Sequence, residues 1–226
     1  MKRLLAFAAL AFCALSAFAG ITYRFDSVTT GTAGGNLSAV AKVEGANMRL
    51  DFLRGDGVLF RDKAVAVSRD AGKTFSVTDP EAKTFYVISS ADLGGLASLL
   101  RQFGRLVTIA IENQKVSVRE GGDGGVIEGF PTRRRIVDAS YDIAIDAMGQ
   151  KIRIHNTSHS EHWLTDRIDA GAGAFFQGTS ATKSGIDALD KLLAAQLAGV
   201  TGFPLKQVTT MRMKMNGQEM VSTTTV

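Results

Sequence analysis

Cysteine is almost absent from this chain: the only one in 226 residues, Cys13, lies inside an apolar run near the N-terminus. A chain that begins after that run has no thiol, which excludes disulfide bonds and thiol chemistry. Longer apolar runs are lacking too, since no later stretch approaches the ~18 residues of a membrane-spanning helix. A large excess of charge of one sign is also lacking, because 26 Lys and Arg are nearly balanced by 22 Asp and Glu. This balance gives no reason to expect a nucleic acid partner.

The first residues have the layout of an export signal. Lys2-Arg3 is a basic start, Leu4 to Leu15 is apolar, and Ala17-Phe18-Ala19 is a small-x-small cleavage site. We therefore expect residues 1–19 to be removed and residues 20–226 to form a single domain; an uncleaved anchor is the alternative. The cysteine follows a bulky residue, unlike a lipidation site, so we expect an exported, periplasmic protein that is soluble and not lipid-anchored.

The C-terminal stretch predicts a hairpin around which the rest of the chain is organised. Leu205 to Met215 alternates between a Met-rich side and a cationic side. Asn216-Gly217 then predicts a type I′ turn, which needs positive φ at both central residues. Gln218 to Val226 returns, rich in Thr and Val. An isolated hairpin is marginal in water, so we expect this ribbon to be the edge of a larger sheet.

Alternating patterns bounded by turn residues predict a meander of about ten strands. Before the terminal ribbon, the expected strands are residues 20–30, 37–44, 47–53, 64–68, 73–78, 83–88, 106–119, 134–146, 150–156 and 160–168. Between them, Gly121 to Gly125 predicts a flexible hairpin tip. Arg133-Arg134-Arg135 predicts a solvated edge strand guarded by charge.

Two segments change to a helical period, residues 91–103 and 184–199, each with an apolar stripe and a glycine near its end. Neither alternates regularly with strands, so a parallel βαβ sheet is not expected. The predicted fold class is therefore mainly β (α+β): a strongly curved antiparallel sheet, or unclosed β-barrel, with the two helices covering its concave face.

Several short motifs carry a resemblance to a known family. They are Glu44-Gly45-Ala46-Asn47-Met48-Arg49-Leu50-Asp51, Tyr141-Asp142-Ile143 with Gly149-Gln150, Trp163-Leu164-Thr165 and Gly202-Phe203-Pro204-Leu205-Lys206. With the export signal and the interrupted meander, the chain resembles an exported branch of the lipoprotein-carrier superfamily, the LolA/LolB-type unclosed β-barrel. The resemblance implies an apolar cavity between sheet and helices, and a lipid or lipoprotein carrier function.

The methionine row of the terminal ribbon is the feature that extends furthest toward function. Methionine is flexible and recurs at surfaces that must fit variable apolar partners. We expect the inside of the curved sheet and the helical stripes to line a cavity through Met48, Leu93, Leu96, Leu99, Leu192, Leu193, Met211, Met213 and Met215. If that space is filled, the same residues are simply a core at normal packing density.

The sequence therefore predicts a non-enzymatic binding protein for a hydrophobic or lipid-like ligand, without a cofactor. The alternative is a cell-envelope interaction or scaffold module with a filled core, whose partners are envelope proteins. Both interpretations follow from the same apolar stripes, and the family resemblance favours the first.

The three histidines, His155, His159 and His162, form the remaining motif, together with Glu161. Imidazoles are common metal ligands, so a metal-dependent hydrolase is a third hypothesis. The polar stretch Asn156-Thr157-Ser158 instead predicts a loop that places the first two histidines on different elements, and this favours an exposed turn without metal. There is no Gly-x-Ser-x-Gly elbow, and no catalytic residue is assigned.

Overall fold

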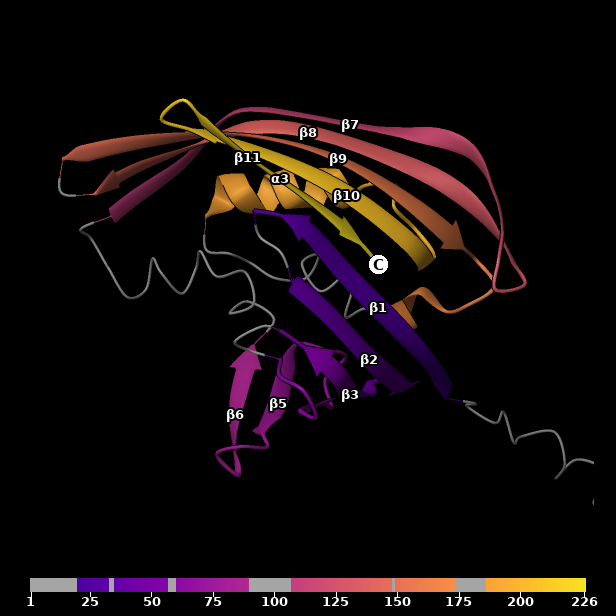
Figure 1. Cartoon of the computed structure of the whole chain (residues 1–226). Coiled ribbons are helices and arrows are strands. Elements are labelled where there is room, and N and C mark those ends of the chain that lie inside the picture. The colour runs from indigo at the N-terminus through magenta and orange to yellow at the C-terminus, as the bar shows by residue number, and fades with distance from the viewer. Residues whose placement is uncertain (1–19, 33–34, 57–59, 90–106, 148, 174–185) are drawn as a thin grey trace, which may run out of the picture.

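The computed structural model describes residues 20–32, 35–56, 60–89, 107–147, 149–173 and 186–226. These residues form one antiparallel sheet of eleven strands (Figure 1). The strands are β1 (Ile21–Gly31), β2 (Gly35–Glu44), β3 (Asn47–Gly55), β4 (Val65–Ser68), β5 (Thr74–Asp79), β6 (Thr84–Ser89), β7 (Val107–Ile127), β8 (Phe130–Ala147), β9 (Gln150–Thr165), β10 (Phe203–Met215) and β11 (Gln218–Thr225). The described part also holds a helix, α3 (Asp187–Leu197), and a 3-10 turn, η2 (Ala170–Gly173).

The first and last strands of the chain pair at the centre of the sheet. The strand order is β6-β5-β4-β3-β2-β1-β11-β10-β9-β8-β7, so β1–β6 and β7–β11 are two meanders joined by the pair β1·β11. The sheet stays open between β6 and β7. The prediction of a mainly β fold with one unclosed antiparallel sheet is confirmed. The terminal ribbon was predicted to be an edge, which is wrong, because β11 pairs with β1.

The turns with the strongest sequence signals are confirmed. Asn216 and Gly217 both have positive φ, at 51° and 80°, as a type I′ turn requires. The β2–β3 hairpin turns at Gly45-Ala46, with Glu44 facing Asn47 across it.

Two predicted loops are strand instead. Gly121 to Gly125 lies within β7, and Asn156-Thr157-Ser158 lies within β9, which pairs with β8 and β10 along both sides. In β7 the glycines allow two bulges and a close approach: a Cβ at Gly124 would lie 2.4 Å from Oγ1 of Thr132. Pairing along a strand satisfies the backbone whatever the local polarity, so tertiary context overrides the loop signals.

The arginine run was also placed wrongly at an edge. Arg133, Arg134 and Arg135 belong to β8, which is flanked by β7 and β9. Each guanidinium has an acidic partner: Arg133 pairs with Asp166, Arg134 with Glu161 at 3.3 Å, and Arg135 with Glu120 at 2.9 Å. The run is therefore a set of ion pairs.

The helix α3 lies under the arch formed by β7–β10 (Figure 1). It contacts β7 and β8, and its Leu192 is buried. A helix within the predicted range 184–199 is thus confirmed, with observed bounds Asp187–Leu197. A Cβ at Gly199, just beyond α3, would lie 3.7 Å from Cγ1 of Val118. Val118 therefore points to the helix side. The other predicted helix, residues 91–103, lies outside the described residues.

We call the face of the sheet that carries Val118 the inner face. The strand register shows which residues of the other strands lie on it. Directly paired residues of antiparallel strands have their side chains on the same face. Starting from Val118, successive pairing reaches Val137, Ser160, Thr209, Thr224 and finally Thr29 of β1. Alternation along β1 then places Ile21, Tyr23 and Phe25 on the same inner face.

The packed core belongs mainly to the first meander. Its buried members come from β1–β6 and the residue just before β4, with one residue of η2 and one at the start of β10. They are Phe25, Ala39, Ala41, Val43, Met48, Leu50, Phe52, Ala64, Ala66, Phe75, Val77, Ile88, Ala172 and Phe203. This core therefore holds the two meanders together beneath the β1·β11 pair.

Asp70 organises the turn between β4 and β5. Its Oδ1 accepts hydrogen bonds from Oγ of Ser68 at 2.8 Å and from the amide of Thr74 at 2.9 Å, and Oδ2 accepts one from Oγ1 of Thr74 at 2.6 Å. These bonds, those from Thr74 first, lower the pKa of Asp70 from 3.8 to about 2. A lowered pKa stabilises the fold above the unfolded value, and that contribution is lost as pH falls through the folded value.

We therefore expect Asp70→Asn to have a lower melting temperature than the wild type near neutral pH, and the difference to shrink between about pH 4 and pH 2. Thermal unfolding followed by circular dichroism across this range is the measurement. Glu44→Gln removes the same charge at a residue that has no ion pair among the described residues, and should show no such trend. A constant difference for Asp70→Asn would contradict the assignment.

Candidate functional site

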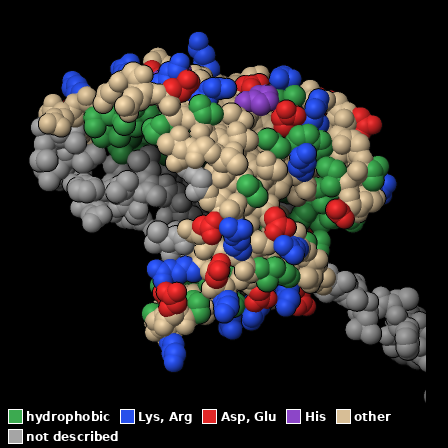
Figure 2. Space-filling view, viewed as in Figure 1, with side chains coloured by type: hydrophobic (Ala, Val, Ile, Leu, Met, Phe, Trp, Pro, Cys, Tyr) green, Lys and Arg blue, Asp and Glu red, His purple; other side chains and the backbone are tan. Residues whose placement is uncertain are grey.

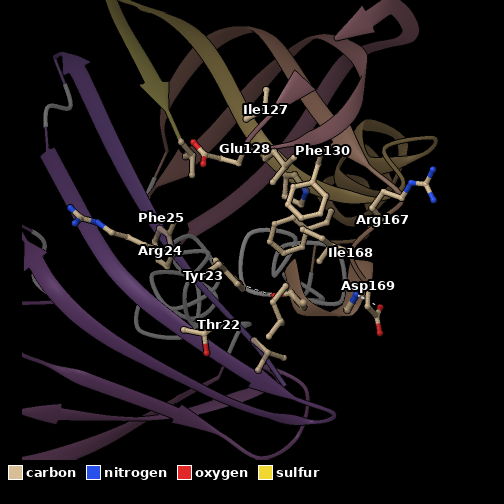
Figure 3. A pocket seen from close by; sticks show the side chains of 18 of the residues that line it. Thr22, Tyr23, Arg24, Phe25, Ile127, Glu128, Phe130, Arg167, Ile168 and Asp169 are labelled. Carbon is tan, nitrogen blue, oxygen red and sulfur yellow. Dashed lines mark hydrogen bonds between the residues drawn. The ribbon is translucent and has the colours of Figure 1, made fainter. Parts of the chain in front are cut away.

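A large cavity lies where the two meanders separate. It is a cleft of about 1150 Å³ between the first half of β1, the β7–β8 tip, the segment before and within η2, and the start of β10 (Figure 3). Pairing between β1 and β11 covers only Val28 to Gly31, so the preceding residues of β1 pair with β2 on one side and border the cleft on the other. The cleft is thus a direct consequence of the strand register.

The floor of the cleft is held by Tyr23. Its hydroxyl donates a hydrogen bond to the carbonyl of Ala172 at 2.7 Å, across 149 residues of sequence. Its ring meets that of Phe203 edge to face, with 5.1 Å between centroids. Burial raises the pKa of Tyr23 well above its usual 10. The side chain therefore remains a neutral phenol that ties β1 to η2 and β10.

The turn η2 is itself fixed by Asp169. Oδ1 of Asp169 accepts the amide of Gly171 at 2.8 Å, and the Asp169 carbonyl accepts the amide of Ala172 at 3.0 Å. Gly173 packs tightly, since a Cβ there would lie 3.0 Å from Cδ of Pro204. The lower end of the cleft is consequently built from short, locally restrained backbone.

The wall of the cleft is apolar and its rim is charged. In Figure 3 Tyr23, Phe130 and Ile168 gather at the centre, whereas Arg24, Arg167 and Asp169 point away from it. The described apolar lining comes from six elements and two residues that flank elements: Ile21, Tyr23, Phe25, Val43, Ile127, Phe130, Ile168, Ala172, Phe203, Pro204, Leu205 and Val226. This division matches the usual character of small-molecule sites, which are mostly apolar with few polar groups.

The described members of the predicted cavity set lie elsewhere. Met211, Met213 and Met215 are half-buried on the inner face of β10, and Leu192 and Leu193 belong to α3 under the same half of the sheet. Met48 is 3% exposed and sits in the core of the other meander. None of these six lines the cleft between β1 and β10. Leu93, Leu96 and Leu99 lie outside the described residues.

The histidines share one strand, which corrects the loop prediction. In β9, His155 and His159 are four residues apart and point to the outer face, opposite Lys214 and Thr210 of β10. His162 points to the inner face and is 9% exposed, and burial lowers its pKa. The run is therefore split between two faces of the sheet, and among the described residues no group of three His, Cys, Asp or Glu side chains could hold a metal ion.

Each outer histidine contacts the aspartate that is directly paired with it in β8. Nδ1 of His155 lies 2.6 Å from Oδ1 of Asp142, and Nδ1 of His159 lies 2.6 Å from Oδ1 of Asp138. The bond to Asp138 raises the pKa of His159. These cross-strand hydrogen bonds link β9 to β8 on the outer face.

The cleft residues Tyr23 and Phe203 were not predicted as site residues. Tyr23 belonged to an expected strand, and Phe203 stood in one of the motifs that carried the family resemblance. Neither signal says that the two residues meet, because they are brought together only by the pairing of the first strand with the last.

In the part of the chain that the structure describes, no helix has both the length and the apolar character needed to cross a bilayer. Neither a scan against protein-family models nor a search among curated proteins found a match for the chain.

Proposed function

We propose that this protein is a non-enzymatic binding protein for an apolar, lipid-like ligand, which it holds in the cleft between β1 and the start of β10. The observation that carries the proposal is the cleft's size and lining: about 1150 Å³ with many apolar side chains along its wall. Small-molecule sites usually span about 300–1,000 Å³. A cavity at or above that range fits an acyl chain better than a compact polar metabolite.

The chemistry of the wall supports binding over catalysis. Among the described residues that line the cleft there is no histidine, cysteine or serine, the side chains that most often supply a base or a nucleophile. The hydroxyl of Tyr23 is already engaged with Ala172. Inside the charged rim, the apolar side chains form a surface that can exclude water from a hydrocarbon chain.

The resemblance to the lipoprotein-carrier superfamily and the export-like N-terminus support the same proposal. In its more specific form, we propose an unclosed barrel that is covered by helices and acts as a soluble periplasmic carrier. In that form α3 is one part of the roof, since it lies under the arch of β7–β10.

The test is a change that fills the cleft. Ile21 is a half-buried lining residue on the inner face of β1, so Ile21→Trp is expected to weaken the binding of a fluorescent fatty acid by about tenfold or more. Fluorescence titration of the full chain gives the dissociation constant. Val28→Trp is the matched control, because Val28 lies on the outer face of the same strand and is 47% exposed.

Three outcomes are distinguishable. Selective loss of binding in Ile21→Trp supports the proposal, and equal affinity in both variants means that the fatty acid binds elsewhere. The absence of binding to the wild type would overturn it.

The second candidate, an envelope interaction module, is favoured by one observation. Phe85 and Val87 are 66% and 62% exposed on β6, which ends the strand order. Exposed apolar side chains on an edge strand are a common feature of protein interfaces.

A further inference from the structure

The outer face of the second meander carries a separate polar groove. It measures about 650 Å³ and crosses β7, β8, β9 and β10. The cross-strand row at its centre is Lys115, Ser140, Thr157 and Arg212, each residue directly paired with the next. Because paired residues share a face, all four side chains lie together. Figure 2 shows that histidine and charged side chains gather over the arched strands.

This row faces away from α3 and from the cleft. Val118 points toward the helix, and Val116, two residues before it, lies on the same inner face. Lys115 directly precedes Val116. Alternation therefore places Lys115 on the opposite, outer face. A ligand in the groove and a ligand in the cleft would occupy different sides of the sheet, so the two sites are independent.

The charges around the groove are paired except at the two ends of the row. Asp138, the one carboxylate among its described lining residues, is engaged by His159 at 2.6 Å and by Arg119 at 3.6 Å. Lys115 and Arg212 form no ion pair with any described residue. The groove therefore presents two cations that no described side chain neutralises.

The middle of the row supplies further donors. In the described part of the chain the hydroxyls of Ser140 and Thr157 have no hydrogen-bond partner, and each can donate one bond. Neighbouring strands lie about 4.8 Å apart, so the backbones of Lys115 and Arg212 are separated by roughly 14 Å. Their long side chains can close over the two hydroxyls from opposite ends.

We propose that this row binds a phosphate group through the ammonium of Lys115, the guanidinium of Arg212 and the hydroxyls of Ser140 and Thr157. A guanidinium fork can engage two phosphate oxygens, whereas lysine acts as a point charge. A tetrahedral anion offers enough acceptor oxygens for all four side chains. A carboxylate has only two oxygens and a single charge, so it would leave donors unused.

The phosphate can belong to a small soluble molecule or to a lipid headgroup, and two measurements on the full chain separate these sources. Isothermal titration with glycerol 3-phosphate detects the soluble form. Co-sedimentation with vesicles of phosphatidylglycerol and phosphatidylcholine in equal parts, compared with phosphatidylcholine alone, detects the headgroup. Binding in either measurement supports a phosphate site and identifies its source.

The decisive variants change charge at matched positions. The double variant Lys115→Gln with Arg212→Gln is expected to weaken binding by about tenfold or more, and Arg212→Lys by several-fold, because it keeps the charge and loses the fork. Lys214→Gln is the control on the same face of β10, where Lys214 pairs with Glu219 at 3.8 Å. A loss of binding free energy in this control of half that of the double variant, as expected when one charge is removed against two, would show attraction by net charge alone and overturn the site, as would no binding of either probe by the wild type.

Discussion

Replacing Gly31 by alanine is expected to lower the free energy of unfolding by about 3 kcal/mol. Gly31 belongs to the last of the four pairs that join β1 to β11 among the described residues, and its φ is +94°. A Cβ there would lie 2.1 Å from the carbonyl oxygen of Val221, which accepts the amide of Thr32 at 3.2 Å. The substitution therefore combines left-handed backbone strain with displacement of a paired strand at the junction of the two meanders.

The matched control is Gly35→Ala. Gly35 begins β2 beside the same strand, opposite Thr29, and a Cβ there meets nothing within 4 Å. Its substitution is expected to change stability by less than about 1 kcal/mol, since alanine only restricts the unfolded chain. Urea unfolding of both variants provides the comparison. Equal stability of the two would mean that β1 and β11 do not pair as described.

Removing the ring of Phe203 is the second change with a large expected effect. Phe203 is 3% exposed and contacts Tyr23, so Phe203→Ala removes an aromatic pair and leaves a hole between β1, η2 and β10. A loss of about 3–5 kcal/mol is expected, as for other buried phenylalanines. In urea, the midpoint should fall while the slope of the transition stays unchanged.

Phe85→Ala separates this packing effect from a general loss of aromatic surface. Phe85 is 66% exposed on β6, so its truncation is expected to shift stability by no more than about 0.5 kcal/mol. A small effect for Phe203→Ala, close to that of Phe85→Ala, would show that the floor of the cleft is not packed as described.

Short-range features of the fold could be predicted from the sequence. The Asn216-Gly217 turn and the hairpin at Gly45-Ala46 were confirmed, and so was the helix around Leu192. Each depends on residues a few positions apart, where turn chemistry and apolar periodicity act directly on the backbone.

The longest strands were broken up because their local signals pointed to loops. The glycines of β7 and the polar residues Asn156 to Ser158 of β9 lack the apolar alternation of a strand. In the sheet, β9 is paired on both sides, and the glycines of β7 accommodate bulges beside β8. Since neighbouring strands supply the stabilising bonds, the sequence of one strand alone could not indicate its length.

The candidate site shows the same limit. An apolar pocket was expected around the methionine row of β10 and the apolar stripes of two helices. The described cleft instead forms around Tyr23, Phe130 and Phe203, which come from three distant stretches. Only the register at the junction of the two meanders brings them to one place.

By itself the sequence determined that this is a mainly β chain with an antiparallel hairpin at its end, because alternation and turn residues act within a few positions. The tertiary structure alone decided that the first and last strands meet. Thr29 and Thr224, 195 residues apart, lie with their hydroxyl oxygens 2.9 Å from each other. Contacts across such a separation depend on the summed packing of all intervening strands against the entropy of closing the loop, and no local pattern encodes that sum.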